Sequence, residues 1–434
     1  MGALHPRRLY LYFAADRSRR RSNGVKNMRD KRQLGIFIPG LMQDAMLKLA
    51  VPQVARMIGY KEEHLPFFSR TLGRVLEDPN AYRSVQIPKR LGGYRTLDIP
   101  NHDLMRLQRR IHSFILVQRY TPSPICHSFV GKLYDRSEIP EKRWRAGRSI
   151  FTNAFAHLAP GPRARRNVRI PSAILTVDLK DAYPSIAADR VFRVYQELTG
   201  DPWTAQIFTH LSVWRGCLPQ GAPTSPMLQN LVYRELDVAL AAEFNKEPLR
   251  LTRYADDFTL TSLRGYIDPK IVIRFIEVVE SHGFPVNRQK VFRWRRKDRR
   301  LRVTGVNILR TAEHPFSLPR KKLEQLRAAL FYAVKTLESA TRYEADRRAA
   351  GTLDITTAKA IDQLRKQTWG RIHGAVGFAV QVYGDELPRV LYKWFGFLRE
   401  KTGITGAELL QQIRESFPAS EIQRSGRELL GDSP

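Results

Sequence analysis

Apolar and polar positions divide the chain into a middle part with β patterns and a helical C-terminal part. The run 173–177 is apolar except for Thr176 and ends at Asp178, which predicts a buried strand. Residues 249–262 form a second β pattern, interrupted in the middle by Ala255, Asp256 and Asp257. We therefore expect two strand segments of one sheet with carboxylates at their ends.

Helical periodicity occurs between and after these strands. One long helix is predicted after the first strand, with Thr224 or Ser225 as its cap and Pro226 in its first turn. Residues 271–282 predict another helix, which ends at Gly283. A basic amphipathic helix follows Ser317. The apolar positions of the first and last of these helices are Leu228, Val232, Leu236, Leu240 and Phe244, and Leu323, Leu326, Leu330, Val334 and Leu337.

The region before the first strand alternates short helical patterns with turn signals over residues 41–170. Residues 88–95 predict a basic hairpin that turns at Gly92 and Gly93. Residues 132–147 and 160–169 are rich in Arg, Lys, Pro and Gly and predict loops.

The charge of the chain points to a polyanionic partner. Lys and Arg number 73 and Asp and Glu 42, a net charge of +31 over 434 residues. Such an excess on a well-folded chain repels itself unless a polyanion neutralises it, and nucleic acid ranks before an anionic membrane surface. Residues 1–40 are either a flexible basic arm or an ordinary solvated tail.

Several other classes of protein are disfavoured. No apolar run approaches the roughly 18 residues of a membrane helix, and the N-terminus lacks the apolar core and cleavage site of a secretory signal. Cys126 and Cys217 are far apart, which argues against a disulfide framework and a zinc site. We expect a soluble cytoplasmic protein without a membrane partner.

Three carboxylates carry the candidate chemistry. Taken singly, adjacent Asp residues in a hairpin tip are usually turn formers, and a strand-terminal Asp is usually a helix cap. Neighbouring strands would, however, bring Asp178 close to Asp256 and Asp257, and clustered carboxylates need divalent cations to offset their repulsion. Two cations about 3.5–4 Å apart are the usual device of polymerases for phosphoryl transfer.

Four boxes, in order, resemble the motifs of reverse transcriptases. Tyr254-Ala255-Asp256-Asp257 resembles their catalytic box, and residues 178–183 resemble their first-aspartate motif. Residues 220–226 resemble the loop that lines the nucleotide and template pocket, and residues 283–290 resemble the next motif. One such box can arise by chance, but four in order indicate the family.

Two further boxes resemble the retron class of reverse transcriptases. Asn153-Ala154-Phe155-Ala156-His157 is similar to their Asn-Ala-x-x-His element, and Val303-Thr304-Gly305 is similar to their Val-Thr-Gly element. His157 could equally be a core histidine and Val303-Thr304 a strand end. The resemblance covers roughly residues 80–400, with the basic stretch 131–147 and the N-terminal arm as extra features.

The resemblance implies a role for each catalytic residue. Asp178 and Asp256 are expected to bind two Mg²⁺ ions, with Mn²⁺ as an alternative. Asp257 is expected either as a weaker ligand or as a neighbour that supports the ligands without binding the metal. The backbone carbonyl of Leu179 would complete one site. Lys290 would protonate the pyrophosphate or simply contact a phosphate.

The resemblance also implies binding residues. Lys89 and Arg95 would grip the triphosphate, or belong to a solvated hairpin, and Gln220 and Gly221 would pack near the nascent base pair. Tyr183 would exclude ribonucleotides, or be a core tyrosine. The expected RNA-binding residues of the two retron boxes are Asn153, His157, Val303, Thr304 and Gly305. Arg320 and Lys321 are expected to bind RNA for another reason, because the basic amphipathic helix after Ser317 either lies along a phosphate backbone or is an ordinary solvated surface helix.

The fold class implied is α+β, a right-hand polymerase with fingers, palm and a helical thumb. We expect a basic arm over 1–40, fingers with part of the palm over 41–172, a palm over 173–310, a thumb over 311–405 and a tail over 406–434.

By resemblance, the first hypothesis is a retron reverse transcriptase in phage defence. Its partners would be deoxynucleoside triphosphates, a structured noncoding RNA that serves as template and 2′-hydroxyl primer, the branched DNA product and an effector protein. A second hypothesis is another bacterial defence reverse transcriptase with different priming. A third hypothesis is a catalytically idle RNA-binding scaffold. It does not explain why three carboxylates are clustered.

Overall fold

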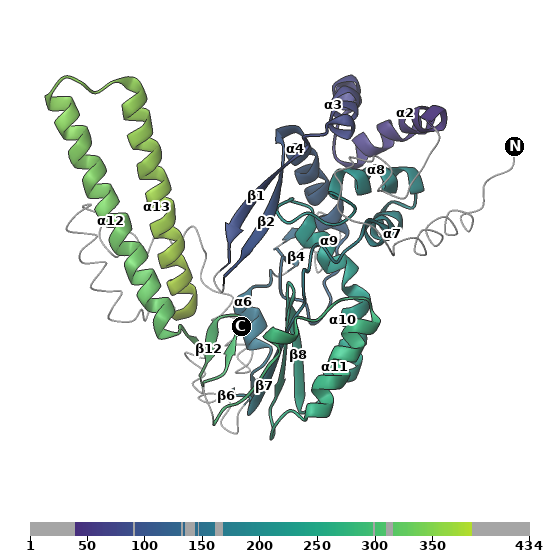
Figure 1. The fold of residues 1–434 in the computed structure, drawn as a ribbon, viewed down its shortest axis with the longest axis vertical. Helices are drawn as coiled ribbons and strands as arrows, with labels where there is room; N and C mark the ends of the chain where they lie inside the picture. The colour runs from purple at the N-terminus through teal and green to yellow at the C-terminus, as the bar shows by residue number, and fades with distance from the viewer. Residues whose placement is uncertain are drawn as a thin grey trace, which may run out of the picture.

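The computed structural model describes residues 40–89, 92–131, 133–134, 144–145, 147–160, 168–297, 300–309 and 316–383. Helices and strands mix through residue 317, and two long helices follow (Figure 1). The expected mixture of α and β structure is confirmed. The expected basic arm over residues 1–40 (all but Gly40), the tail over 406–434, thumb residues 384–405 and most of the stretch 131–147 lie outside the described residues.

A four-stranded antiparallel sheet forms the middle of the molecule. Its strands are β7 (Ala173–Asp178), β8 (Leu249–Tyr254), β9 (Asp257–Ser262) and β10 (Phe292–Arg295), in the order β10-β7-β9-β8. The predicted strand before Asp178 and the predicted hairpin around Asp256 are both confirmed. Because successive side chains of a strand point to opposite faces, the sheet separates two packing regions.

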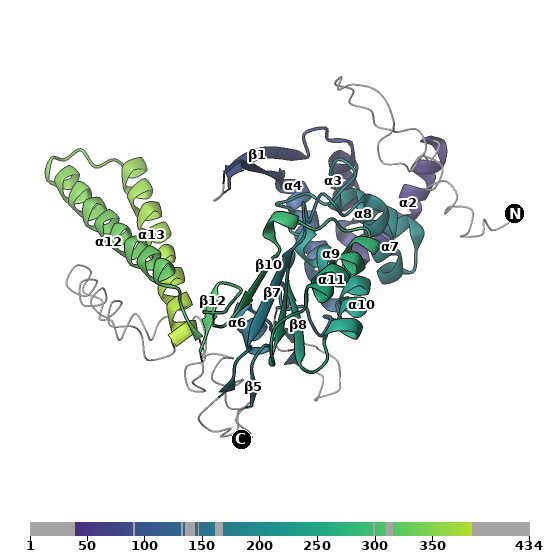
Figure 2. The same ribbon diagram turned by 60° about the horizontal axis from the view of Figure 1, so that its bottom comes forward.

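One face of this sheet packs in the main core. Leu175, Val177, Phe258 and Leu260 join helices α10 (Arg234–Phe244) and α11 (Pro269–Ser281) there. Figures 1 and 2 show these helices on one side of the sheet and α6 (Ile150–Phe155) on the other. On that second side Ile174 packs with Phe151, Phe155 and the C-terminal elements.

The helix predicted after Thr224 forms, with Pro226 in its first turn and its end at Phe244, but it differs from the prediction in two details. It is two helices, α9 (Ser225–Val232) and α10, which meet at Tyr233. The Tyr233 hydroxyl donates to the carbonyl of Ala182, and its ring packs edge-on against Phe284. These tertiary contacts hold Tyr233 in the core. Thr224 makes no cap hydrogen bond, whereas the Ser225 hydroxyl donates to the carbonyl of Pro219.

The N-terminal part is a helical layer with a projecting hairpin (Figure 1). Strands β1 (Tyr82–Pro88) and β2 (Tyr94–Pro100) pair in antiparallel register, and Gly92 and Gly93 have the positive φ that the predicted turn requires. The surrounding helices are α2 (Gly40–Met57), η3 (Glu62–His64), α3 (Leu65–Glu77), α4 (His102–Ile111), η4 (His112–Leu116), α5 (Val117–Arg119), α7 (Ala188–Thr199) and α8 (Pro202–Ser212).

A small sheet connects the middle part to the C-terminal helices. It contains β11 (Arg302–Val303), β12 (Val306–Ile308) and β13 (Phe316–Ser317). Helices α12 (Arg320–Ala349) and α13 (Ile355–Tyr383) then form an antiparallel pair that leans away from the four-stranded sheet (Figures 1 and 2). The apolar positions predicted for α12 are buried at Leu326, Leu330, Val334 and Leu337.

The remaining described elements are short. They are β3 (Leu133–Tyr134), β4 (Trp144–Arg145), β5 (Ala159–Pro160), β6 (Val168–Arg169) and η6 (Arg288–Lys290). In the part of the chain that the structure describes, no helix has the length and apolar character to cross a membrane.

Candidate active site

The three predicted carboxylates meet at one end of the four-stranded sheet. Asp178 on β7 is the register partner of Asp257 on β9, so both side chains project from the same face. Asp256 lies in the turn before β9, and its carbonyl accepts a hydrogen bond from the Leu179 amide at 3.1 Å. The preceding turn residue, Ala255, has a φ of 57°.

A buried ion pair stabilises the backbone of this turn. The Arg253 guanidinium and the Asp237 carboxylate are both fully buried and form hydrogen bonds of 2.6 and 2.7 Å. Arg253 Nη1 also donates to the carbonyl of Ala255 at 2.9 Å and to Asn230 Oδ1 at 3.0 Å. These contacts support a left-handed backbone position that a non-glycine residue rarely adopts.

Sequence reasoning missed Arg253 and Asp237. The signal was the alternation that places Arg253 on the same face of the β segment as Leu249 and Leu251, because a guanidinium buried with them requires a buried counter-charge. Nothing in the segment itself indicates that Asp237 provides it.

Crowding of the carboxylates shifts their protonation. Asp257 is exposed as a residue, but burial of its carboxyl, followed by the charges of Asp256 and Asp178, raises its pKa to about 7. Burial is also the main reason that the pKa of Asp256 is raised, and the charge of Asp178 adds to it. A cation placed among these groups would therefore relieve a real electrostatic cost.

The cation that the structure shows at this cluster is an ammonium group. Lys290 Nζ donates to Asp178 Oδ2 at 2.8 Å. Within the described residues, no group of three or more His, Cys, Asp or Glu side chains is arranged so that it could hold a metal ion as it stands. The donor set nevertheless fits Mg²⁺, which prefers carboxylate oxygens, and Lys290 shows that this end of the sheet accepts positive charge.

The residues expected at the nucleotide lie on three elements. Burial and, after it, the charge of Asp256 raise the pKa of Tyr183 to about 12, and its side chain is partly buried against the main core. Gly221 has a φ of 124°, and a Cβ there would lie 2.9 Å from the carbonyl oxygen of Asp98. The Asp98 amide donates to the carbonyl of Gln220 at 2.8 Å, which ties β2 to this loop.

Lys89 and Arg95 are exposed on the β1–β2 hairpin. Among the described residues, no hydrogen bond or ion pair joins either side chain to the carboxylates. The hairpin cations therefore lie at a solvent-facing position, without a direct contact to the carboxylates in the part of the chain that the structure describes.

The residues of the two retron boxes are mostly interior. Asn153 and His157 are fully buried, and Val303 is 1% exposed. His157 makes hydrogen bonds of 2.7 Å with Thr261 and 2.8 Å with Thr252 on the sheet, and burial lowers its pKa to about 3. These side chains present no surface to RNA in this structure, so the expectation that they contact it directly needs correction.

Thr304 and Gly305 form the turn between β11 and β12, and both have positive φ. The Thr304 hydroxyl donates to the carbonyl of Ile150, the first residue of α6, at 2.9 Å. The two retron boxes therefore belong to one structural unit, in which α6 joins the turn to the four-stranded sheet.

Arg320 and Lys321 are exposed at the start of α12. Arg320 forms a salt bridge of 3.0 Å with Glu324 one turn later. Both cations are accessible to an RNA phosphate.

Comparison with known proteins identifies the family of this chain. Residues 87–308, just over half of the 434 residues, match the reverse transcriptase (RNA-dependent DNA polymerase) family. The retron Mx162 reverse transcriptase of Myxococcus xanthus is 32% identical over 308 residues, which cover 64% of this chain and 57% of the relative. The retron Mx65 reverse transcriptase of the same organism is 32% identical over 352 residues, which cover 76% of this chain and 71% of the relative.

A solved telomerase from Candida albicans, in complex with a fragment of telomeric RNA, aligns with 82% of this chain and 70% of its own. It is 12% identical, with a TM-score of 0.36, a level that has no bearing on function. The family match and the two retron relatives agree with the boxes found in the sequence. The chain belongs to the reverse transcriptase (RNA-dependent DNA polymerase) family and is of the retron type.

Proposed function

We propose that the protein is the RNA-directed DNA polymerase of a retron, which uses a structured noncoding RNA as template and 2′-hydroxyl primer and makes branched, RNA-linked single-stranded DNA. The observation that carries this proposal is the convergence of Asp178, Asp256 and Asp257 at one end of the sheet. A binding scaffold would gain nothing from three repelling carboxylates.

The carboxylates would act through bound Mg²⁺, with Mn²⁺ as an alternative. Asp178 and Asp256 would bind two ions, with Asp257 as a weaker ligand and the Leu179 carbonyl as an additional oxygen. When bound, the ions activate the primer hydroxyl and neutralise the triphosphate and the departing pyrophosphate. Lys290, already at this cluster, would turn from Asp178 to the pyrophosphate and either protonate it or pair with its charge.

The remaining residues would position the nucleotide. Lys89 and Arg95 would hold the triphosphate when the hairpin closes on it, and Gln220 and Gly221 would contact the nascent base pair. Gly221 suits this role because its backbone already lies too close to Asp98 for a side chain. Tyr183 would lie under the sugar and exclude a 2′-hydroxyl.

These roles imply a right-hand arrangement. The elements before residue 173 would act as fingers with part of the palm, residues 173–310 as the palm, and residues 311–405, which include α12 and α13, as the thumb. Arg320, Lys321, Thr304 and Gly305 would contact RNA directly. Asn153, His157 and Val303 would act by holding α6 and the β11–β12 turn in place.

The proposed partners are the structured RNA, deoxynucleoside triphosphates, the DNA product and an effector protein, with antiphage defence as the biological role. The alternative is a defence reverse transcriptase with different priming, which needs the same carboxylates but no branched product. The priming chemistry therefore decides between the two.

The test is the linkage in the product. The protein should be expressed with its native flanking DNA, and the nucleic acid that co-purifies with it should be analysed. We expect single-stranded DNA that keeps a short RNA stub after ribonuclease treatment and loses it to a debranching enzyme. DNA with a free 5′ end before any processing, or DNA attached to protein, would exclude retron priming but leave the polymerase assignment intact.

A further inference from the structure

A hollow lies on the face of the sheet from which Asp178 projects. Ile174 and Thr176 line it, four and two positions before Asp178 on β7. Side chains two apart on a strand share a face and are about 6.6 Å apart. The hollow therefore begins directly beside the candidate active site. We call it the β10 pocket because β10 forms its aromatic wall.

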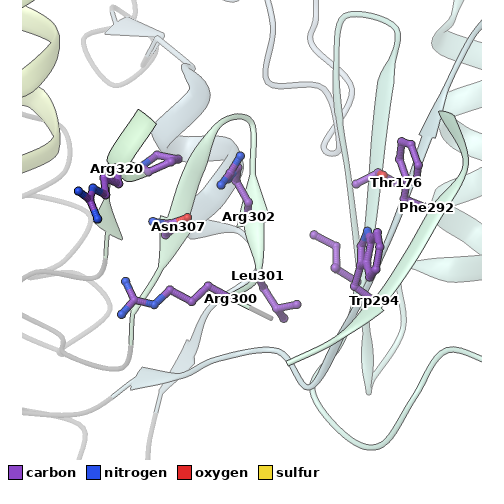
Figure 3. A pocket seen from close by; sticks show the side chains of 10 residues that line it. Thr176, Phe292, Trp294, Arg300, Leu301, Arg302, Asn307 and Arg320 are labelled. Atoms are coloured by element: carbon purple, nitrogen blue, oxygen red, sulfur yellow. The ribbon is translucent and has the colours of Figure 1, made fainter. Parts of the chain in front are cut away.

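The β10 pocket has one aromatic wall and one basic wall (Figure 3). Phe292 and Trp294 form the first, with ring centroids 6.3 Å apart and planes 21° apart, and Phe292 is 45% exposed. Arg300, Leu301 and Arg302 come from the other side. The cavity volume of about 400 Å³ lies within the usual range for ligand pockets.

The lining carries positive charge without matching carboxylates. Arg300, Arg302 and Arg320 line the pocket, and none of the lining residues is acidic. Arg320 pairs with Glu324, but in the described ranges no carboxylate pairs with Arg300 or Arg302. Guanidinium groups without a partner bind phosphate well, often through two hydrogen bonds.

A polar group completes the pocket. Asn307 lines it, and its amide nitrogen Nδ2 donates to Ser317 Oγ at 3.2 Å. This orientation leaves the amide oxygen Oδ1 as an acceptor for a hydroxyl or an exocyclic amine. An exposed aromatic ring, arginines and one amide acceptor are the elements with which proteins bind an unstacked nucleotide.

We propose that the β10 pocket binds one unpaired nucleotide of the RNA strand that continues past the priming ribose. The base would stack on Phe292, and its phosphate would pair with Arg300 or Arg302. This inference rests on the proposed function. A ribose that carries DNA on its 2′ oxygen and RNA on its 3′ oxygen is a branch point from which two strands continue. When the first deoxynucleotide is added, this ribose lies at the carboxylates and the new DNA pairs with the template, so the RNA strand must leave the duplex there.

The occupant can be identified by photocrosslinking. A short single-stranded oligouridine with one 4-thiouridine is irradiated with the full-length protein, and the crosslinked peptides are mapped by mass spectrometry. We expect a crosslink in the peptide that contains Phe292 and Trp294, and a weaker one with the deoxyuridine strand. Crosslinks confined to other peptides, or equal crosslinking of the DNA strand, would overturn the proposal.

Variants test the two walls. Phe292→Ala should weaken binding of the oligouridine at this site by about five- to a hundredfold, the contribution of one stacked base. Phe292→Leu keeps the bulk and should lose nearly as much, and Arg302→Gln should lose the phosphate contact. Arg295→Gln is the matched control, because Arg295 is exposed on the same strand but faces the other side of the sheet. An unchanged crosslink in both Phe292 variants would also contradict the proposal.

The experiment separates failure of this inference from failure of the proposed function. Crosslinking needs no catalysis, whereas wild-type primer extension on an RNA template reports the polymerase directly. A protein that extends primers and makes branched product but shows no crosslink at β10 would refute only the pocket assignment. A protein that makes no DNA would refute the proposed function.

Discussion

The ammonium nitrogen of Lys290 lies 2.8 Å from Oδ2 of Asp178 and so places a positive charge on a proposed metal ligand. Burial opposes this charge, but the hydrogen bond with Asp178 and the attraction of Asp178, Asp257 and Asp256 outweigh it and raise the pKa of Lys290. A divalent ion that binds Asp178 must compete with this ammonium group. Lys290 is therefore expected to influence both metal affinity and the chemical step.

Lys290→Gln should have two opposite effects. It should lower the concentration of Mg²⁺ needed for half-maximal DNA synthesis, because the competing cation is removed. It should also slow nucleotide incorporation about a hundredfold or more, the usual contribution of a proton donor. Single-turnover incorporation at varied Mg²⁺ measures both.

Lys290→Arg distinguishes the two proposed roles of Lys290. Arginine keeps the positive charge but does not give up its proton. If Lys290 only pairs with phosphate, this variant keeps most of the wild-type rate. If Lys290 protonates the pyrophosphate, Lys290→Arg is as slow as Lys290→Gln. An unchanged rate of incorporation in both Lys290→Gln and Lys290→Arg would contradict both proposed roles.

Asp256→Asn should abolish Mg²⁺-dependent DNA synthesis on an RNA template, because one neutral ligand disrupts the metal site. RNA binding should remain nearly intact, since the basic surface is unchanged. Primer extension and a filter-binding assay measure the two properties. Asp268→Asn is a suitable control, because Asp268 caps α11 away from the sheet end and Asn caps equally well. Near-normal extension by Asp256→Asn would exclude the catalytic assignment.

The sequence predicted the parts of the site that depend on strand ends. The buried run before Asp178 and the hairpin around Asp256 are local patterns, and pairing of their strands is enough to bring the carboxylates together. The Arg253–Asp237 pair was missed because its partners lie on different elements and only tertiary packing selects them.

The raised pKa values predict how stability depends on pH. Folded Asp257 keeps its proton up to about pH 7, whereas an unshifted carboxyl loses it near 3.8. Between these values the folded protein binds more protons than the unfolded chain, so the free energy of unfolding falls as pH rises. Asp256, whose pKa is also raised, contributes with the same sign.

Asp257→Asn should therefore flatten this dependence. Urea unfolding in EDTA at pH 5 and pH 8 should show a smaller loss of stability for the variant than for the wild type, and Mg²⁺ should restore part of the wild-type loss. Asp268→Asn again serves as the control and should behave as wild type. Equal losses in Asp257→Asn and wild type would mean that the carboxylates do not repel one another as inferred.

Tyr183→Ala tests selection of the sugar. The charge of Asp256 contributes to the raised pKa of Tyr183. If the ring lies under the sugar as proposed, its removal should let a ribonucleotide enter, so that discrimination against ribonucleotides falls roughly tenfold or more. Competing incorporation of matched ribo- and deoxynucleoside triphosphates measures this ratio. A variant that polymerises with unchanged discrimination would show that Tyr183 is a core residue.

His157 provides a test of how the retron boxes act. Its ring bridges Thr252 and Thr261, whose hydroxyls are buried. His157→Leu leaves both hydroxyls without this partner and should lower the free energy of unfolding by about 2–4 kcal/mol. His157→Leu combined with Thr252→Val and Thr261→Val should recover part of the loss, because no orphaned hydroxyl remains.

His102→Leu is the control for this prediction, since the His102 side chain is 83% exposed and its loss should cost little. RNA binding by His157→Leu, measured at a temperature where the variant is folded, distinguishes a structural role of His157 from a direct contact with RNA. Because His157 is fully buried, the affinity for RNA should fall only to the extent that the substitution displaces α6 and the Thr304 turn. A large loss of RNA affinity with unchanged stability would mean that His157 turns outward to meet RNA, and the interior role inferred from its two threonine partners would be wrong.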